Sequence, residues 1–231
     1  MREVLEEGLP ALGLDSAMIP ALECFVQMLL QRNRVMNLTA ITEPRDVAAL
    51  HLLDSLELIP LAGLEDGTVV DVGTGAGFPG LPLAVMRPQM QVTLLDSLGK
   101  RIDFLREVCE SLGVTNAECV HGRAEEFAAT RREAYDWAVS RAVAALPVLS
   151  ELCLPLVKVG GHFLAMKSSH TEAEIDQAKG AIKTLGGRII WVRDYRIPMT
   201  EVVHRVICIE KNTSTPPKYP RRFAQIKKAP L

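Results

Sequence analysis

Apolar positions in residues 1–64 recur with the spacing of helices. One helical face is formed by the apolar residues Leu22, Phe25, Val26 and Leu29. A second helix is expected after Pro44 with Thr42 as its N-cap, and Ser16 is the expected N-cap of the first. No alternating strand pattern interrupts these segments. Residues 1–64 are therefore predicted to form a helical extension.

From residue 65 the pattern changes to short β-branched runs separated by helical segments. Five strands are predicted at 68–72, 91–96, 117–120, 136–140 and 162–166. Strands that alternate with helices form a parallel sheet through right-handed crossovers. Two more strands, 189–192 and 202–209, follow each other without a helix and predict an antiparallel pair at the sheet edge.

The predicted fold class is α/β, with a Rossmann-like, mostly parallel seven-stranded sheet, an antiparallel edge strand and the N-terminal helical extension. Three segments are expected: the extension at 1–64, the sheet domain at 65–210 and a C-terminal tail at 211–231. A chain of 231 residues suits one large domain of this kind, and a monomer is expected.

Composition indicates a soluble protein with a core, since 48% of residues are hydrophobic and 23% are charged. The apolar runs are too short for a membrane span, and the first residues lack the order of a signal peptide. The five cysteines are widely spaced without a C-x-x-C pair, so neither a disulfide framework nor a metal site is predicted. A cytoplasmic protein with reduced thiols is expected.

The net charge is −2, yet the tail is basic. Its cations, with no acid among them, are Lys211, Lys218, Arg221, Arg222, Lys227 and Lys228. Charge alone leaves two interpretations: a solvated tail, or an arm that contacts nucleic-acid phosphates.

A glycine-rich loop follows the first predicted strand and enters a helix, which is the context of a nucleotide-binding loop. A dinucleotide fingerprint needs a third glycine where this chain has Phe78. Asp71, just before the loop, would favour a ligand that carries an ammonium and a sulfonium over a pyrophosphate. S-adenosylmethionine is therefore the predicted cofactor, with candidate loop contacts Asp71, Gly73, Thr74, Gly75, Gly77 and Phe78.

The second strand ends at Asp96, about 20 residues beyond the loop, where an acid commonly holds ribose hydroxyls. Asp96 and its neighbour Ser97 are thus candidate cofactor contacts. Because nicotinamide coenzymes also use such an acid, Asp96 alone does not choose between the two nucleotides.

Two motifs that the sequence lacks limit the kind of atom that could accept the methyl group. After the fourth strand the chain reads Ser140-Arg141-Ala142-Val143, without the Asn/Asp-Pro-Pro-aromatic loop of amino-group methylation, and Cys153 lies in an apolar helix. Guanine N7 offers a free lone pair, so positioning and desolvation suffice for it. Three cations that follow successive strands are the candidate catalytic residues: Arg123, Arg141 and Lys167.

His51, Asp54 and Ser55 do not predict a hydrolase triad, because all three fall within one helical turn and no G-x-S-x-G motif accompanies them. A polar helix face or a wall of the cofactor pocket is the expected role.

Several motifs, in order along nearly the whole chain, resemble the RsmG family, also called glucose-inhibited division protein B. They are Asn37-Leu38-Thr39-Ala40, His51 to Leu56, Asp71 to Gly80 with its Gly-Phe-Pro-Gly ending, Gly122 to Glu125, Ser140-Arg141-Ala142 and Lys218-Tyr219-Pro220-Arg221-Arg222. Where the family often has Lys-Gly after the fifth strand, this chain has Lys167-Ser168.

The resemblance implies a class I methyltransferase sheet and methylation of guanine N7 at position 527 of 16S ribosomal RNA, with S-adenosylhomocysteine as product. Its partner would be 16S ribosomal RNA or the small ribosomal subunit. The family's cofactor contacts map onto Gly73, Phe78, Ala124, Glu125 and Arg141. The tail residues Lys218, Tyr219, Arg221 and Arg222 become an expected RNA contact or folded cap.

Three alternatives stay open at this point: a small-molecule methyltransferase, a nicotinamide oxidoreductase on a similar sheet, and an RNA-binding protein without catalysis.

Overall fold

A computed structural model describes residues 1–231 and contains one seven-stranded sheet of order β3-β2-β1-β4-β5-β7-β6. The strands are β1 (Thr68–Val72), β2 (Gln91–Asp96), β3 (Ala117–His121), β4 (Tyr135–Arg141), β5 (Val157–Ser168), β6 (Gly187–Arg196) and β7 (Val203–Lys211). The first five pair in parallel, and β7 is antiparallel to both β5 and β6. The carboxyl ends of β1 to β5 therefore meet at one edge of the sheet.

Helices precede and separate the strands. The N-terminal part contains α1 (Arg2–Ala11), the short η1 (Ser16–Met18), α2 (Ile19–Met36), α3 (Pro44–Val47), the π-helix η2 (Ala48–Leu53), α4 (Asp54–Leu56) and α5 (Leu58–Ala62). The crossovers and the tail contain α6 (Gly80–Met86), α7 (Gly99–Leu112), α8 (Ala124–Phe127), α9 (Leu146–Cys153), η3 (Leu154–Leu156), α10 (Glu172–Thr184) and α11 (Phe223–Lys228).

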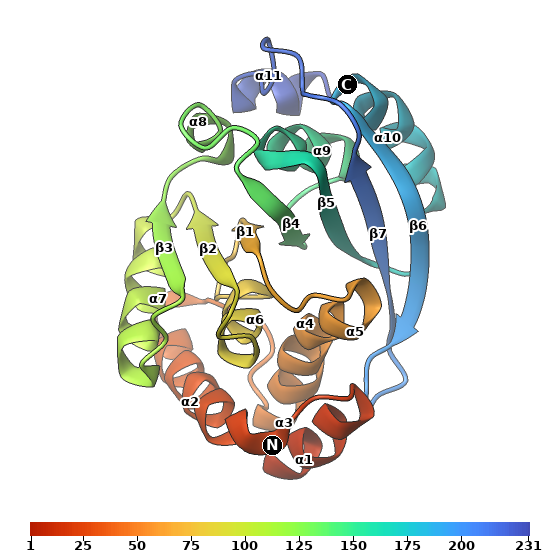
Figure 1. Cartoon of the computed structure of the whole chain (residues 1–231). Coiled ribbons are helices and arrows are strands. Elements are labelled where there is room, and N and C mark those ends of the chain that lie inside the picture. The colour runs from red at the N-terminus through yellow and green to blue at the C-terminus, as the bar shows by residue number, and fades with distance from the viewer.

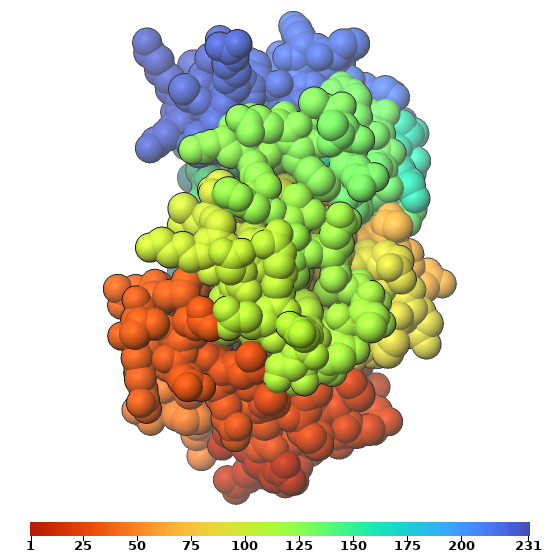
Figure 2. All heavy atoms as spheres, turned by 90° about the vertical axis from the view of Figure 1, so that its left-hand side faces the viewer, coloured from red at the N-terminus to blue at the C-terminus, as the bar shows by residue number.

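The sheet separates two hydrophobic cores. On one face α1 to α7 pack together, and their core includes Leu22, Phe25 and Leu105. On the other face the core joins α8 to α11 and includes Leu149 and Ile226. Figure 1 shows the N-terminal helices and α11 on opposite sides of the sheet, and Figure 2 shows the two termini at opposite ends of the molecule. The N-terminal extension is thus part of the main core.

Most of the predicted architecture is confirmed. All seven predicted strands exist, with β5 longer than expected because it begins at Val157. The terminal antiparallel pair lies at the predicted edge, and β7, one place in from that edge, is the strand that runs against the others. Since β7 extends to Lys211, that residue belongs to the sheet and the C-terminal tail begins after it.

Both predicted helix caps were wrong. Met18 and Glu43 occupy the N-cap positions of α2 and α3 without side-chain hydrogen bonds, while Asp15 accepts from the Ala17 amide at the start of η1. Burial of Leu22 and Val47 against the core stabilises these helix starts without a polar cap.

None of the helices is both long and apolar enough to cross a bilayer. All five cysteines carry free thiols, and Cys109, Cys153 and Cys208 are buried as expected from their apolar neighbours.

Candidate functional site

A cavity of about 1080 Å³ opens at the carboxyl ends of the parallel strands. Its wall combines loops after β1, β2, β4 and β5 with the N-terminal helices and the start of β7. Most of the residues predicted for catalysis or cofactor binding line it: Gly73, Thr74, Gly75, Phe78, Asp96, Ser97, Arg141 and Lys167. The N-terminal extension closes one side of this cavity through Thr39, His51 and Asp54.

Asp71 supports the glycine loop from inside. Its Oδ2 accepts hydrogen bonds from Thr74 Oγ1 at 2.7 Å and from the Gly80 amide at 2.8 Å. The side chain is fully buried, which raises the pKa of Asp71 to about 6. Asp71 does not line the cavity. The direct contact with a positively charged ligand that was expected of Asp71 is therefore corrected to bracing of the loop.

The loop conformation requires glycine at its start. Gly73 and Gly75 have φ angles of +74° and +61°, and a Cβ on Gly73 would approach Val143 Cγ2 to 2.5 Å. The Gly73 amide donates to Leu95 O, which ties the loop to the end of β2. Gly73 and Gly75 thus line the cavity with backbone atoms alone.

Asp96 is held in place at the end of β2, as predicted. Its carboxylate accepts hydrogen bonds from the amides of Gly75 and Leu98, both at 2.9 Å, and from Arg101 at 3.2 Å. It is only 3% exposed, yet it lines the cavity beside Ser97. These bonds fix the carboxylate against the loop, so a ligand in the loop would meet a preorganised acceptor.

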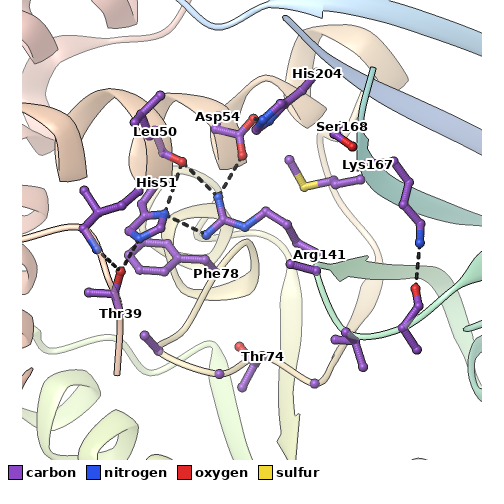
Figure 3. A pocket seen from close by; sticks show the side chains of 18 of the residues that line it. Thr39, Leu50, His51, Asp54, Thr74, Phe78, Arg141, Lys167, Ser168 and His204 are labelled. Carbon is purple, nitrogen blue, oxygen red and sulfur yellow. Dashed lines mark hydrogen bonds and ion pairs between the residues drawn. The ribbon is translucent and has the colours of Figure 1, made fainter. Parts of the chain in front are cut away.

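Arg141, at the end of β4, is clamped by the N-terminal helices (Figure 3). Its Nη1 donates to Asp54 Oδ2 at 2.8 Å and to Leu50 O at 3.3 Å, and its Nη2 donates to His51 Nδ1 at 3.2 Å. The guanidinium also lies 5.1 Å from the centre of the Phe78 ring. Leu50 and His51 belong to the π-helix η2, a geometry that is frequent at functional sites.

Asp54 is the centre of this cluster and is completely buried. Its Oδ1 accepts from Tyr195 Oη at 2.7 Å and from His204 Nδ1 at 2.8 Å. Burial raises the pKa of Asp54, but the His204 hydrogen bond and the Arg141 charge outweigh it and hold the pKa below its usual value. His51 and Asp54 line the cavity, and their expected role as a wall of the cofactor pocket stays a prediction. Tyr195 and His204 were missed.

His51 is neutral and lies between Arg141 and Phe78 of the glycine loop. Burial and the Arg141 charge lower the pKa of His51 to about 4. Because Nδ1 accepts from Arg141, Nε2 carries the proton and donates to Thr39 Oγ1 at 2.8 Å. The imidazole stacks on Phe78 with ring centres 4.7 Å apart. The pair Phe78 and His51 thus gives the cavity a firm apolar wall.

Glu57 lies one helical turn beyond Asp54, and its ionisation reports on the buried charge of Asp54. Burial and then the Asp54 charge raise the pKa of Glu57 from 4.5 to about 7, and its Oε2 is buried without a partner. A raised pKa means that the folded state binds the proton more tightly, so this group lowers stability progressively as the pH rises from about 4.5 to 7. Replacing Glu57 with Gln should therefore raise the free energy of unfolding more at pH 8 than at pH 5.

Urea denaturation at the two pH values measures this effect, with Glu110→Gln on the exposed face of α7 as the control. An equal effect of Glu57→Gln at both pH values would show that Glu57 is not strained by its burial.

Lys167 braces the loop that follows β4. Its Nζ donates to Ala144 O at 2.6 Å and to Glu174 Oε1 at 2.5 Å, and Glu174 also accepts from the Leu146 amide. Lys167, predicted as a catalytic cation, is thus already paired with an acid in the structure.

The three cations predicted at successive strand ends are not all brought together. Arg141 and Lys167 line the cavity, but Arg123 does not. Arg123 begins α8 and packs 5.6 Å from the centre of the Phe223 ring at the start of α11. Gly77, Ala124 and Glu125 do not line the cavity either. Their contacts with a cofactor stay predictions.

The basic tail is a folded cap in which several cationic side chains are already bonded to other groups of the protein. Arg221 forms an ion pair at 2.6 Å with the fully buried Glu151 of α9, and Tyr219 is buried. Lys211 is also buried, with Nζ donating to Leu154 O at 2.6 Å. Lys218 and Arg222 remain exposed. Of the predicted RNA contacts, these two present free cationic groups to the surface.

Comparison with protein families gives one match over most of the chain. The family model described as rRNA small subunit methyltransferase G matches residues 18–198. A ribosomal RNA small subunit methyltransferase G from Alkaliphilus metalliredigens is 46% identical over 233 residues, which cover 99% of this chain and 98% of that protein. The protein of the same name from Halalkalibacterium halodurans is 45% identical over 100% of this chain and 97% of its own length.

Solved structures share the sheet at low sequence identity. TrmN from Thermus thermophilus superposes with a TM-score of 0.54 and 22% identity over 68% of this chain and 48% of its own. A SAM dependent methyltransferase from Aquifex aeolicus gives 0.53 and 19% over 70% and 92%. These likenesses confirm the Rossmann-like methyltransferase fold.

Proposed function

Because the chain belongs to the family of rRNA small subunit methyltransferase G, we propose that it methylates N7 of a guanine in small-subunit ribosomal RNA. Membership in the family makes it a methyltransferase of ribosomal RNA, and S-adenosylmethionine is the methyl donor expected for this family and fold. The guanine, its N7 and position 527 of 16S ribosomal RNA are the proposed part, as is a monomeric enzyme that acts in the cytoplasm.

The observation that supports N7 is the end of β4, which reads Ser140-Arg141-Ala142-Val143 and lacks the Asn/Asp-Pro-Pro-aromatic loop of amino-group methylation. Asp54, Asp96 and Glu174 are the acids that line the cavity, and each is held by protein donors. Guanine N7 carries a free lone pair and needs no base to remove a proton. Cys153 is fully buried outside the cavity, and burial raises its pKa well above the usual value, which excludes it as a nucleophile.

The residues present fit the proposed donor. The positive φ angles of Gly73 and Gly75 expose backbone to the cavity, and Asp96 with Ser97 would hold the hydroxyls of a ribose. When bound, S-adenosylmethionine supplies a methyl group activated by a sulfonium. Ala124 and Glu125, which do not line the cavity, are proposed as further contacts of its adenine end. The fixed Arg141 would orient what binds next to the donor.

Transfer of labelled methyl groups to small ribosomal subunits that lack the modification tests this proposal. We expect the label in RNA, and digestion to nucleosides should identify it as 7-methylguanosine. Subunits assembled with 7-deazaguanosine at the target position serve as the control and should stay unlabelled. Label recovered as an amino-methylated or carbon-methylated nucleoside would overturn the N7 assignment.

The exposed cations of the tail are proposed to contact RNA phosphates. Replacing Lys218 and Arg222 with Ala should weaken RNA binding, and each lost phosphate contact should reduce the slope of log K against log salt by roughly 0.7–0.9. Arg2→Ala on α1, at the opposite end of the molecule, is the matched control (Figure 1). An unchanged salt slope in the double variant would refute an RNA role for the tail.

A further inference from the structure

His204 divides its two ring nitrogens between the buried cluster and the cavity. Nδ1 lies 2.8 Å from Asp54 Oδ1, whereas Nε2 has no hydrogen-bond partner in the protein. The side chain lines the cavity and is 29% exposed. His204 therefore turns a free polar atom toward whatever fills this part of the cavity.

The hydrogen-bond network fixes which nitrogen carries the proton. Asp54 is ionised, and a carboxylate can only accept hydrogen bonds, so Nδ1 must donate to it. Tyr195 Oη donates to the same carboxylate and holds its orientation. With the Nδ1 proton held by Asp54, the neutral form of the imidazole has its lone pair on Nε2. A rigid hydrogen-bond acceptor thus faces the cavity.

His204 lies away from the glycine loop. Across the sheet the strand order at the cavity is β2, β1, β4, β5 and β7, and Asp96 stands at one end of this row. His204 stands at the other end, directly opposite Ser168 of β5 in the strand register, and both side chains line the cavity (Figure 3). With the donor over β1 and β2, the part near His204 is left for the acceptor base.

The chemistry of guanine matches this acceptor. Its Watson–Crick edge carries the N1–H and 2-amino donors, while N7 lies on a different edge of the base. A base held by its Watson–Crick edge keeps N7 free. Adenine instead has a lone pair at N1, which would oppose the lone pair of Nε2.

We propose that His204, oriented by Asp54, accepts a hydrogen bond from the Watson–Crick edge of the acceptor guanine and so selects guanine while leaving N7 open to the donor. This assignment rests on the proposed function. An enzyme that works on a base must take it out of the stack, and hydrogen bonds to that edge then identify it. The Ser168 hydroxyl, directly across from His204, lies in the same subsite.

His204→Asn is the variant that separates the two ring nitrogens. The shorter amide can still donate to Asp54 in the place of Nδ1, but nothing replaces Nε2. We expect affinity for S-adenosylhomocysteine to stay within about twofold, and kcat/KM for small subunits to fall by about tenfold or more, as for loss of one substrate hydrogen bond. His162→Asn, on β5 outside the cavity, is the matched control.

Modified targets decide whether the lost bond goes to the base. Small subunits carrying 1-methylguanosine or inosine at the target position remove N1–H and the 2-amino group, respectively. With one of these two bases, the activity of the wild-type enzyme should fall, while the activity of His204→Asn should not fall any further. Such non-additive losses indicate that His204 and the altered group of the base contact each other. Additive losses for both bases would overturn the proposal.

The outcomes separate this inference from the proposed function. If the wild-type protein does not methylate small subunits, the proposed function itself fails. If it does and His204→Asn matches it in kcat/KM, only the role of His204 fails. Donor affinity and thermal midpoint, measured for each variant, identify a change caused by misfolding.

Discussion

Replacing Asp54 with Ala is expected to lower the free energy of unfolding by about 3–5 kcal/mol and to abolish methyl transfer. The carboxylate is completely buried and holds three donors, namely Arg141, Tyr195 and His204. Its removal leaves a largely buried guanidinium without its charged partner and frees three elements that it joins: η2–α4, β4 and the β6–β7 pair. Urea denaturation at neutral pH measures the loss.

Asp54→Asn is the matched variant for the charge, since it keeps the volume and one acceptor oxygen. It should be less damaging than Asp54→Ala. Because the pKa of Asp54 is lowered in the folded state from 3.8, its stabilisation is complete above that value and is lost as the pH falls through the folded pKa. The difference between wild type and Asp54→Asn should therefore shrink in acid. A loss below about 1 kcal/mol for Asp54→Ala at neutral pH would contradict a central role for the cluster.

Replacing Asp96 with Ala is expected to weaken binding of S-adenosylhomocysteine by about 100-fold. Two hydrogen bonds from ribose hydroxyls to a carboxylate, each contributing about 1.5 kcal/mol, account for this loss. Titration calorimetry measures the affinity directly. Asp103→Ala, on the same sequence segment but exposed on α7, should bind as the wild type does.

Asp96 also accepts from the Gly75 and Leu98 amides, so its loss loosens the loop as well. Asp96→Asn separates the two effects, because the amide oxygen can still accept from a backbone amide. We expect it to restore thermal stability more fully than donor affinity. An affinity of Asp96→Ala within about threefold of wild type would show that Asp96 does not hold the donor.

Local patterns were sufficient to predict the sheet and the loop. The strand-loop-helix order around Gly73 and the acid at the end of β2 are set by neighbouring residues, and Asp96 lies where the spacing placed it. The same spacing could not show that Asp71 points into the loop. That depends on how α6 packs against β1.

The Asp54 cluster could not be predicted, because its members are distant in the chain. Tyr195 and His204 lie 141 and 150 positions from Asp54, on strands with no motif of their own. Only the pairing of β6 and β7 beside β5 brings them to the N-terminal helices. Composition likewise could not predict that the tail is folded. Arg221 and Lys211 count as free cations in the sequence, but in the fold Arg221 pairs with the buried Glu151 and Lys211 donates to the Leu154 carbonyl.

We expect the donor to lie over β1 and β2 and to leave the other half of the cavity, at β5 and β7, for the base. A crystal structure of the protein soaked with S-adenosylhomocysteine tests it most directly. We expect the ribose against Asp96, the amino-acid part along the glycine loop, and open space beside His204. Density for the ligand beside His204 and Ser168, with Asp96 untouched, would contradict it.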